Sequence, residues 1–588
     1  MTIFPSRQSP VRLGLELVGS VLLVWAATSY LLLFMHRGAN LLDEGSQVAM
    51  ANRILHGEVI YRDFLAVATP GSFYTVAILF QLFGTDLMVL RWAVFALSLG
   101  ILIVTLIIAR HLMSWPFAAA SALLTIVWGW FLVAPNLYSW QAMFLALCAL
   151  LCYLRYARTY RRSWLVAAGI ACGAAICFKQ NTGIYATTGL LLCLWLSRVF
   201  ETGQIWDPWR ERWYGTRFFL KGVALVVFSM LLCLIYLGAA AHLYENWFYY
   251  PIQLYPEGLR VDYPAFYPLV AKPGFETLRQ VLPDLVTERI AQPAGWEIWQ
   301  KFVLYLPWLV YPFTLVALCV LLVRKVNDDN ALTALEGHSL LAVTSFGALT
   351  FLQAWPRADV THILFGMQPA FVLLGYLCYS CWRIARNRFS ALTSTAVLVL
   401  LLLPYALLIR NGYKYTEYGF QNEYVPIRAA RAGGVRTSVR NAAQIDRVTE
   451  YITTHTAPGD PIFVVPWAAG FYFLTGRPNP TRFDVLLYGD PDQYPCLIAT
   501  LDQRRPKYVI YGYGWDVDGK RFREYAQPID EYVRTRYRIA ERVDEYEIWR
   551  RLDNTEAVYR DTTGACRRRM FNAREFGRLL RQIFWGGR

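Results

Sequence analysis

The sequence predicts a mainly α-helical protein: a polytopic bundle of about eleven transmembrane helices, followed by a small α/β domain outside the membrane. Of the 588 residues, 56% are hydrophobic and only 17% are charged, which is more apolar than a soluble protein of this length. Apolar stretches of about 18 residues or more recur from Leu13 to Leu408, and each can cross a hydrocarbon core about 30 Å thick. None follows Ile409. We therefore expect a membrane part, residues 1–410, and a soluble domain, residues 411–588.

The first expected span is residues 13–35. Arg7 and Arg12 precede this run of about 23 residues, which is longer than the core of a signal peptide and lacks a small-residue cleavage site. We interpret it as a retained span. The other expected spans are 88–109, 116–134, 141–155, 164–178, 182–198, 218–242, 300–323, 338–355, 361–382 and 391–409.

The orientation depends on the run from Thr69 to Gly84, which is apolar but short for a crossing. If this run lies flat at the interface, every short basic loop falls on the side of the N-terminus, as the positive-inside rule requires. Counting it as a span would move the four arginines of residues 155–162 to the outside. We therefore expect a multi-pass protein of the inner or plasma membrane with a cytoplasmic N-terminus. Loops 36–87 and 243–299 and the C-terminal domain are then extracytoplasmic.

The charge and the cysteines exclude some classes of function. A net charge of +15 in a membrane protein reflects loops that face anionic lipid, so membrane lipids are expected partners and nucleic acid is not. Nine of the 11 cysteines lie in apolar spans, where they act as small hydrophobic residues, so the pair Cys378 and Cys381 is not interpreted as a metal site. Cys496 and Cys566 lie in the soluble domain, where pairing is open.

The outer segments also contain regular patterns. The aromatic stretch Asn246–Pro268 fits either an interfacial belt or a platform for sugar rings, and both interpretations stay open. In the soluble domain, residues 442–455 predict an amphipathic helix, and residues 461–466, 507–511 and 546–550 predict strands. Residues 567–588 carry seven arginines among apolar residues, which fits a membrane-surface helix or a disordered tail.

Polar residues that could take part in catalysis or binding occur in three predicted outer segments. Asp43 and Glu44 follow the first span directly, and adjacent carboxylates are expected only at the water boundary or in a polar cavity. A plain helix cap is the alternative for Asp43. The other candidates are Arg53 and Arg62 in the same loop, Lys179 and Gln180 after the glycines at 169 and 173, and Arg357, Asp359 and His362 in one short turn.

These residues converge on one face of the membrane in the predicted topology. Cations could hold and neutralise a phosphate as it leaves, while a carboxylate deprotonates an incoming hydroxyl. Group transfer from a phosphorylated lipid would need this combination. The structural alternatives are a lysine that extends to the headgroups at Lys179 and an ion pair that closes the turn between Arg357 and Asp359.

The order of these motifs resembles the type C glycosyltransferase superfamily. The likeness covers residues 13–410 and is nearest to bacterial relatives of dolichyl-phosphate-mannose protein mannosyltransferases and of the lipid A aminoarabinose transferase. It implies that Asp43 matches the acidic residue of the first outer loop and that Lys179 lies where members place a basic residue near the donor phosphate. It does not assign Arg357, Asp359 or His362. Several members carry a second acidic residue in the next outer turn, but residues 134–140 contain no carboxylate, which argues against a two-carboxylate or metal-dependent scheme.

The resemblance and the residues together predict an inverting hexosyl- or pentosyltransferase. Its donor would be a polyprenyl-phosphate sugar, and its acceptor a glycan, lipid or protein hydroxyl. Asp43 would be the catalytic base, and no cofactor is expected, although metal dependence stays open. The expected donor-phosphate and substrate-binding residues are Glu44, Arg53, Arg62, Lys179, Gln180, Arg357, Asp359 and His362. The alternatives are a transporter or flippase of lipid-linked saccharides, disfavoured because the spans carry few interior charges, and a non-catalytic scaffold.

Overall fold

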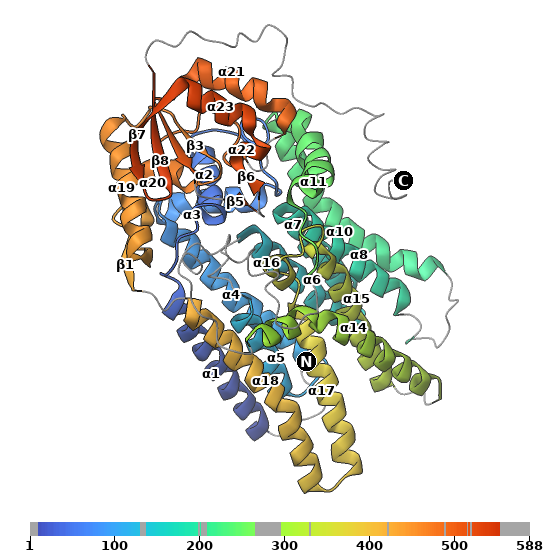
Figure 1. The fold of residues 1–588 in the computed structure, drawn as a ribbon. Coiled ribbons are helices and arrows are strands. Elements are labelled where there is room, and N and C mark those ends of the chain that lie inside the picture. The colour runs from blue at the N-terminus through green and yellow to red at the C-terminus, as the bar shows by residue number, and fades with distance from the viewer. Residues whose placement is uncertain are drawn as a thin grey trace.

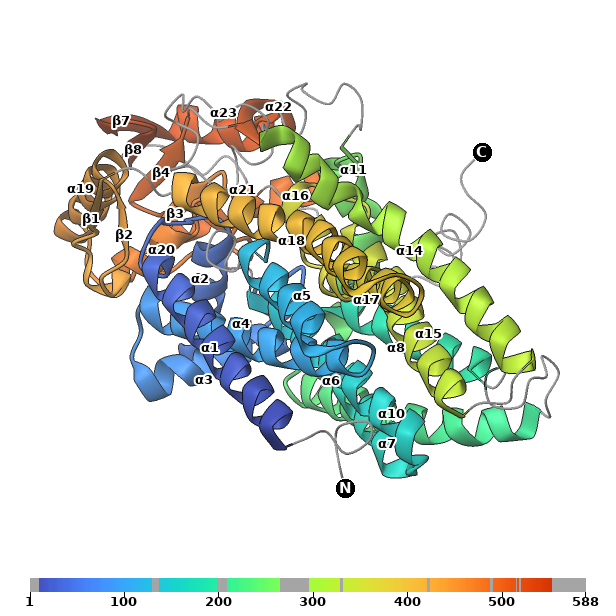
Figure 2. The ribbon, with the colours of Figure 1, turned by 90° about the horizontal axis from the view of Figure 1, so that it is seen from below.

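The computed structural model describes residues 10–129, 137–197, 200, 209–264, 296–327, 331–419, 423–486, 490–513, 516–517 and 520–552. Long helices make up the membrane part, and a smaller domain formed by the end of the chain covers one end of it (Figure 1). In the view turned by 90°, α1 and α18 lie on the same side of the bundle as α5 and α17 (Figure 2).

Seven helices of the described residues are long and apolar enough to cross a membrane. Each contains or closely matches one of the expected spans. They lie within α1 (Pro10–Phe34), α4 (Leu87–Arg110), α6 (Leu137–Thr159), α10 (Trp209–Tyr236), α14 (Trp296–Asn327), α15 (Ala331–Phe351) and α18 (Ala391–Gly419). Large apolar side chains on these helices face outward, where lipid would cover them; Trp25, Phe228, Phe313 and Leu392 are all exposed. The chain is therefore a multi-pass membrane protein.

The four remaining expected spans are helical, but three of the helices have fewer than 18 residues and the fourth span is interrupted. They correspond to α5 (Trp115–Val127), α7 (Arg162–Phe178), α8 (Gln180–Leu196) and the pair α16 (Val360–Leu364) and α17 (Gln368–Arg388). The run 361–382 breaks after Leu364 because Pro369, in the first turn of α17, favours the start of a new helix. The predicted helical membrane fold is confirmed, whereas the number eleven stays a prediction.

Loop 36–87, the predicted first outer loop, contains α2 (Asp43–Leu55) and α3 (Gly71–Phe83). Helix α3 covers the run that the sequence places at the interface. Ile78, Leu82 and Phe83 on α3 are exposed. The segment before α3 is attached to the end of α7, because Thr69 Oγ1 donates to the carbonyl oxygen of Ile176 at 2.6 Å.

The second outer segment is described as far as residue 264. Its short helices are η1 (Ala240–His242), the π-helix η2 (Glu245–Leu254) and α11 (Tyr255–Leu259). Trp247 of η2 donates from Nε1 to the hydroxyl of Tyr61 at 3.0 Å. The rest of the predicted aromatic stretch lies outside the described residues.

The C-terminal domain is built on a four-stranded sheet of order β3-β4-β8-β7. Strand β3 (Ile462–Val465) is parallel to β4 (Tyr508–Gly512), whereas β8 (Tyr546–Arg551) is antiparallel to β4 and to β7 (Tyr537–Val543). Three predicted strands and the predicted helix, here α19 (Val439–His455), are present. The smaller elements of this domain are β1 (Tyr424–Pro426), β2 (Arg436–Ser438), β5 (Asp516–Val517), β6 (Lys520–Arg521), α20 (Gly470–Thr475), α21 (Tyr494–Arg504), α22 (Phe522–Tyr525), α23 (Gln527–Arg536), η4 (Ala430–Ala432) and η6 (Pro491–Gln493). In the membrane part, η3 (Leu352–Ala354) follows α15.

Two predictions about the end of the chain fall partly outside the described residues. Helix α18 continues to Gly419, beyond the boundary placed at residue 410, and the division into two domains stays a prediction. Cys496 is disulfide-bonded, but Cys566 and the arginine-rich segment 567–588 lie outside the described residues. The nine cysteines of the apolar spans are free thiols.

The C-terminal domain packs directly on the first outer loop. A Cβ atom on Gly45 would lie 2.6 Å from the backbone nitrogen of Gly470, so α2 and α20 can approach only because both residues are glycine. The N–H of Gly470 donates to the carbonyl oxygen of Leu41 at 3.0 Å, and the N–H of Leu65 donates to the carbonyl oxygen of Arg482 at 2.9 Å. The domain therefore covers the segment that carries the predicted catalytic acid.

Candidate active site

Asp43 is the first residue of α2, and Asn40 shapes the turn before it. The side-chain oxygen of Asn40 accepts from the backbone N–H groups of Leu42 at 3.1 Å and Asp43 at 2.8 Å, while its amide donates to Asp43 Oδ2 at 3.4 Å. Asp43 does not cap its own helix, because the N-cap position is Leu42 and no side-chain cap bond is present. The Asp43 carboxylate is available for another role.

Glu44 has a different environment from its neighbour. Its carboxylate forms a bidentate ion pair with Arg91 of α4. Arg91 Nε donates to Glu44 Oε1 at 2.7 Å, and Arg91 Nη2 donates to Glu44 Oε2 at 2.8 Å. The same guanidinium donates to the carbonyl oxygens of Met35 and Arg37, and both side chains are almost fully buried. Glu44 thus fixes the loop after α1 to α4, and its proposed contact with substrate stays a prediction without geometric support.

Lys179 occupies the turn between α7 and α8. Its ammonium donates to Ser139 Oγ at 3.0 Å and lies over the rings of Phe365 and Tyr138, at 5.1 Å and 5.9 Å from their centroids. No ion pair of Lys179 occurs within the described residues. Burial lowers the pKa of Lys179 to about 8, although the charge of Asp359 acts in the opposite direction.

The turn that precedes α16 holds Arg357, Asp359 and His362 together. Arg357 Nε donates to Asp359 Oδ2 at 2.7 Å, and Asp359 Oδ1 accepts from the backbone N–H of His362 at 2.9 Å and contacts its Nδ1 at 2.8 Å. Burial acts to raise the pKa of Asp359, but His362 and Arg357 outweigh it and hold that pKa well below its usual range. Asp359 therefore orients two basic side chains while it stays ionised.

Electrostatic interactions connect the three segments. Burial raises the pKa of Asp43, and the charges of His362 and Arg357 oppose that shift. The negative charge of Asp359 in turn acts to raise the pKa of both Asp43 and Lys179. The structure thus brings together five of the predicted residues from three parts of the chain. We call them the inner cluster: Asp43, Lys179, Arg357, Asp359 and His362.

A small hollow of about 30 Å³ adjoins Asp43. That volume accommodates about one water molecule or hydroxyl group. Tyr138, whose ring lies beneath Lys179, forms part of the wall, and Phe483 and Asp484 of the C-terminal domain form another part. The hollow therefore lies where the membrane part and the C-terminal domain meet.

The remaining predicted residues have other partners. Arg53 pairs with Glu58 at 2.7 Å and with Asp484 at 3.1 Å. Arg62 pairs with Asp63 at 2.8 Å and donates to the carbonyl oxygen of Leu237. Gln180 donates to the carbonyl oxygen of Val67 at 3.2 Å. The structure does not join these three residues to the inner cluster, and their binding roles stay predictions.

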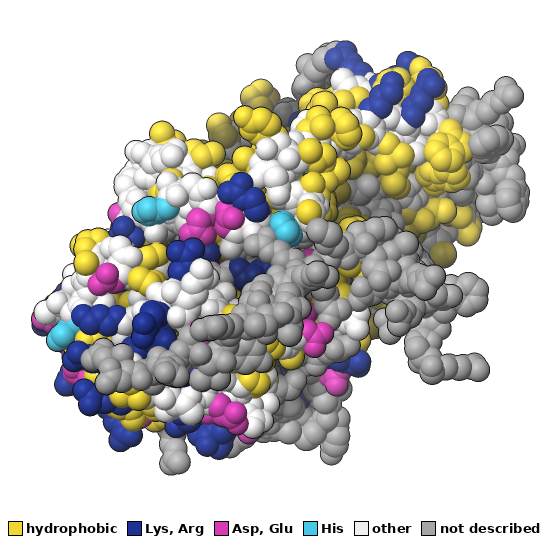
Figure 3. All heavy atoms as spheres, turned by 90° about the horizontal axis from the view of Figure 1, so that it is seen from above, with side chains coloured by type: hydrophobic (Ala, Val, Ile, Leu, Met, Phe, Trp, Pro, Cys, Tyr) yellow, Lys and Arg dark blue, Asp and Glu magenta, His cyan; other side chains and the backbone are white. Residues whose placement is uncertain are grey.

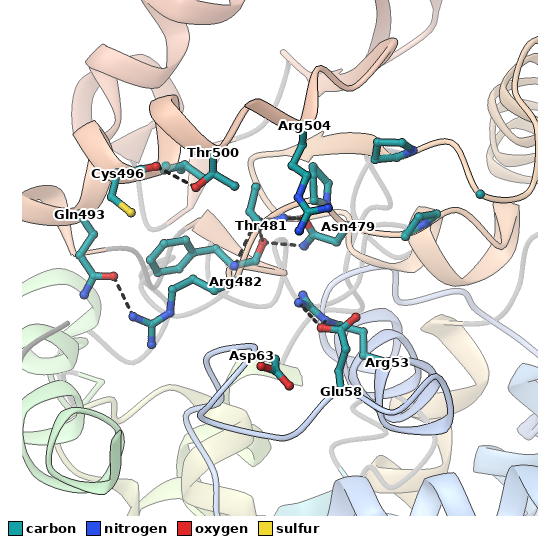
Figure 4. Close-up of a pocket in the computed structure, with 16 residues that line it drawn as sticks. Arg53, Glu58, Asp63, Asn479, Thr481, Arg482, Gln493, Cys496, Thr500 and Arg504 are labelled. Atoms are coloured by element: carbon teal, nitrogen blue, oxygen red, sulfur yellow. Dashed lines mark hydrogen bonds and ion pairs between the residues drawn. The ribbon is translucent and has the colours of Figure 1, made fainter. Parts of the chain in front are cut away.

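A larger cavity of about 650 Å³ lies between the first outer loop and the C-terminal domain. Arg53, Glu58 and Asp63 rise from the loop side, opposite a wall of polar side chains from the C-terminal domain (Figure 4). Phe483 lines both this space, which we call the outer cavity, and the hollow beside Asp43. Seen from above, basic, acidic and histidine side chains lie close together near the middle of the exposed face, where it is hollowed (Figure 3).

Sequence reasoning missed several residues that shape the site. Asn40 carried a local signal, because an asparagine three residues before Asp43 is typical of a turn that leads into a helix. Ser139, Arg91 and Asp484 carried none, since each meets its partner only through tertiary contacts. Among the described residues, no group of three or more potential metal-ligating side chains is present.

Comparisons with known proteins agree with this architecture. No family model and no curated protein matches the sequence. Among solved structures, ArnT from Cupriavidus metallidurans bound to undecaprenyl phosphate is 14% identical, with a TM-score of 0.50 over 91% of this chain and 98% of ArnT. The archaeal oligosaccharyltransferase AglB from Archaeoglobus fulgidus, in complex with an inhibitory peptide and a dolichol-phosphate, is 12% identical, with a TM-score of 0.51 over 84% of this chain and 69% of AglB.

This chain shares the fold of these two structures. The likeness extends over both the membrane part and the C-terminal domain, because it covers 91% of the residues. At 14% and 12% identity it establishes the fold alone, so the chemistry of this chain must be argued from its own residues.

Proposed function

We propose that the protein is a membrane glycosyltransferase that moves a monosaccharide from a polyprenyl phosphate to an acceptor hydroxyl on the extracytoplasmic face. The observation that supports this most strongly is the inner cluster, which holds an acid, Asp43, and a cation, Lys179, neither of which has an ion-pair partner within 4 Å among the described residues. Charges that are partly buried and lack partners are costly and mark functional sites in membrane proteins. A phosphate and a hydroxyl would supply the missing partners.

The donor is expected to be lipid-linked for two reasons. Charge bias predicts that the inner cluster lies on the outer side of the membrane, where nucleotide sugars are absent. The two solved structures that share the fold hold undecaprenyl phosphate and dolichol-phosphate. Lys179 and Arg357 would hold the donor phosphate, because ammonium and guanidinium groups form strong charge-assisted hydrogen bonds to phosphate oxygens. Asp359 and His362 keep Arg357 in place.

The transfer step then needs one base. The acceptor oxygen forms a bond to the anomeric carbon on the face opposite the phosphate, while the bond from that carbon to the phosphate oxygen breaks. The electron pair leaves with the polyprenyl phosphate, and the acceptor proton passes to Asp43. Because burial raises its pKa, Asp43 is a stronger base than an exposed carboxylate. Displacement from the opposite face inverts the configuration of the anomeric carbon.

The acceptor would enter from the C-terminal domain. The outer cavity is lined in part by polar side chains, among them Asn479, Gln493 and Arg504, and Phe483 lines both this cavity and the hollow beside Asp43. Side chains of this kind form directional hydrogen bonds to hydroxyl groups. We place the polar body of the acceptor in the outer cavity, with its reacting hydroxyl beside Asp43.

The test uses the purified full-length chain in nanodiscs. It is supplied in turn with radiolabelled polyprenyl-phosphate mannose, arabinose, galactose and glucose, and with a membrane extract as the source of acceptors. We expect one of these donors to be turned over, and Asp43→Asn to reduce turnover at least about a thousandfold while the melting temperature and donor binding stay unchanged.

Three other results would each contradict part of the proposal. Full activity of Asp43→Asn would remove Asp43 from the catalytic role. Donor binding without turnover would indicate a scaffold. Movement of intact donor across sealed proteoliposomes, without release of the sugar, would indicate a transporter.

A further inference from the structure

Asp484 of the C-terminal domain is buried beside the hollow that Asp43 also lines. Its side chain is fully shielded from solvent. Oδ1 accepts from Arg53 Nη1 at 3.1 Å and from Asn479 Nδ2 at 3.0 Å. Oδ2 is equally buried, yet it has no hydrogen-bond partner among the described residues. Half of this carboxylate is therefore held in place and half is unsatisfied.

An unsatisfied carboxylate oxygen in a buried site is costly, because the group has lost water and gained nothing in return. The cost disappears if a donor occupies the space next to Oδ2. The hollow, of about 30 Å³, can hold one hydroxyl group or one water molecule. Asp43 of the membrane part and Asp484 of the C-terminal domain both line this hollow.

Contacts with neighbouring residues hold Asp484 in place. Arg53 connects it to α2, the same helix that begins with Asp43. Arg482, two residues earlier, pairs with the buried Glu245 at 2.9 Å, and its carbonyl oxygen accepts from Leu65. These contacts attach the segment that carries Asp484 to both predicted outer loops, which restrains Asp484 relative to Asp43.

We propose that Asp484 is a positioning residue: its Oδ2 accepts a hydrogen bond from the hydroxyl group, or from the water molecule, that attacks the donor. Asp43 takes the proton, and Asp484 aligns the oxygen for the attack. This inference rests on the proposed function and extends it, because it makes the C-terminal domain part of the active site.

The test measures hydrolysis of the polyprenyl-phosphate sugar that the unmodified chain turns over, with water as the attacking group, so that the natural acceptor need not be known. Asp484→Asn replaces the accepting oxygen by a group of the same size. We expect kcat for hydrolysis to fall about tenfold or more, while KM for the donor changes less than about twofold, because Asp484 does not contact the donor phosphate.

Asp502→Asn is the matched control. Asp502 is also a buried carboxylate of the C-terminal domain, with Oδ1 bonded to Tyr532 and Arg551 and with Oδ2 unpartnered among the described residues. It does not line the hollow. We expect Asp502→Asn to change the melting temperature as much as Asp484→Asn does and to leave kcat unchanged.

The outcomes separate the two proposals. If no donor is turned over by the unmodified chain, the proposed function falls and this inference falls with it. If the unmodified chain is active and the two variants are equally active, only the role of Asp484 is overturned. If Asp484→Asn does not fold, a cryo-EM map of the unmodified protein decides: an ordered water within hydrogen-bond distance of Oδ2 supports the role, and a protein donor at that position overturns it.

Discussion

The charges where the C-terminal domain meets the helices and the charges of the inner cluster differ in how completely they are paired. At the junction with the C-terminal domain, Arg91 pairs with Glu44, Arg53 with Glu58 and Asp484, and Arg482 with Glu245. Among the described residues, Lys179 of the inner cluster donates a hydrogen bond to a serine hydroxyl alone, and the Asp43 carboxylate accepts one long bond, from the Asn40 amide. The paired charges hold parts of the molecule together, and the unpaired ones suit the ligands of the proposed function.

The largest expected effect concerns the paired set. Glu44→Gln should lower the free energy of unfolding by about 3–5 kcal/mol, because it leaves Arg91 buried without its counter-ion. Asp43→Asn, one residue earlier, should change it by less than about 1 kcal/mol. Thermal unfolding in detergent measures both variants. Equal losses of stability would show that the contrast between the two carboxylates is wrong.

The next effect concerns Lys179. Lys179→Met should weaken donor binding about 10- to 100-fold, the value of one charge-assisted hydrogen bond to phosphate. In the unmodified chain the affinity should also decrease above about pH 8, because the Lys179 pKa of about 8 makes the ammonium lose its proton there. Lys179→Arg keeps its charge and should bind the donor equally well at pH 7 and pH 9. Fluorescence titration with a polyprenyl phosphate measures the affinity of the unmodified chain and of both variants. If the affinity of Lys179→Arg also decreases above pH 8, the decrease is caused by a group other than Lys179.

A smaller effect is expected for Arg357. Its positive charge favours the ionised form of Asp43, so removing it in Arg357→Gln should raise the pKa of Asp43 further. The base is active only when ionised, and the acid limb of the kcat profile should therefore move to higher pH, by about half a unit to one unit. A shift to lower pH would mean that a group other than Asp43 determines the acid limb.

The smallest effect is expected at the rim of the outer cavity. Arg504 is exposed at the end of α21, so Arg504→Ala should change neither stability nor donor hydrolysis by more than about twofold. If the acceptor body occupies the outer cavity, transfer to the acceptor should fall more than hydrolysis does. An unchanged ratio of transfer to hydrolysis would place the acceptor elsewhere.

Local patterns were sufficient to predict many elements of the fold. The hydrophobic lengths predicted the seven long helices, and the amphipathic and β-rich stretches predicted α19, β3, β4 and β8. The break after Leu364 was missed, because hydropathy averages over the turn that separates α16 from α17. Strand β7 was also missed, since most of its side chains face away from the core and its sequence, YRIAERV, carries little β signal.

The sequence by itself determined the class of the molecule and the segments in which charged residues lie at the ends of apolar spans. It did so because hydrophobic length and charge bias are local properties of the chain. Only the tertiary structure decided which charges are paired. Asp43 and Glu44 are adjacent in the chain, and they differ only because Arg91 approaches Glu44 from α4. Likewise, Asp484 lies beside the hollow in a segment that an ion pair with Arg53 connects to α2. Such contacts join distant residues, and no pattern within one segment contains them.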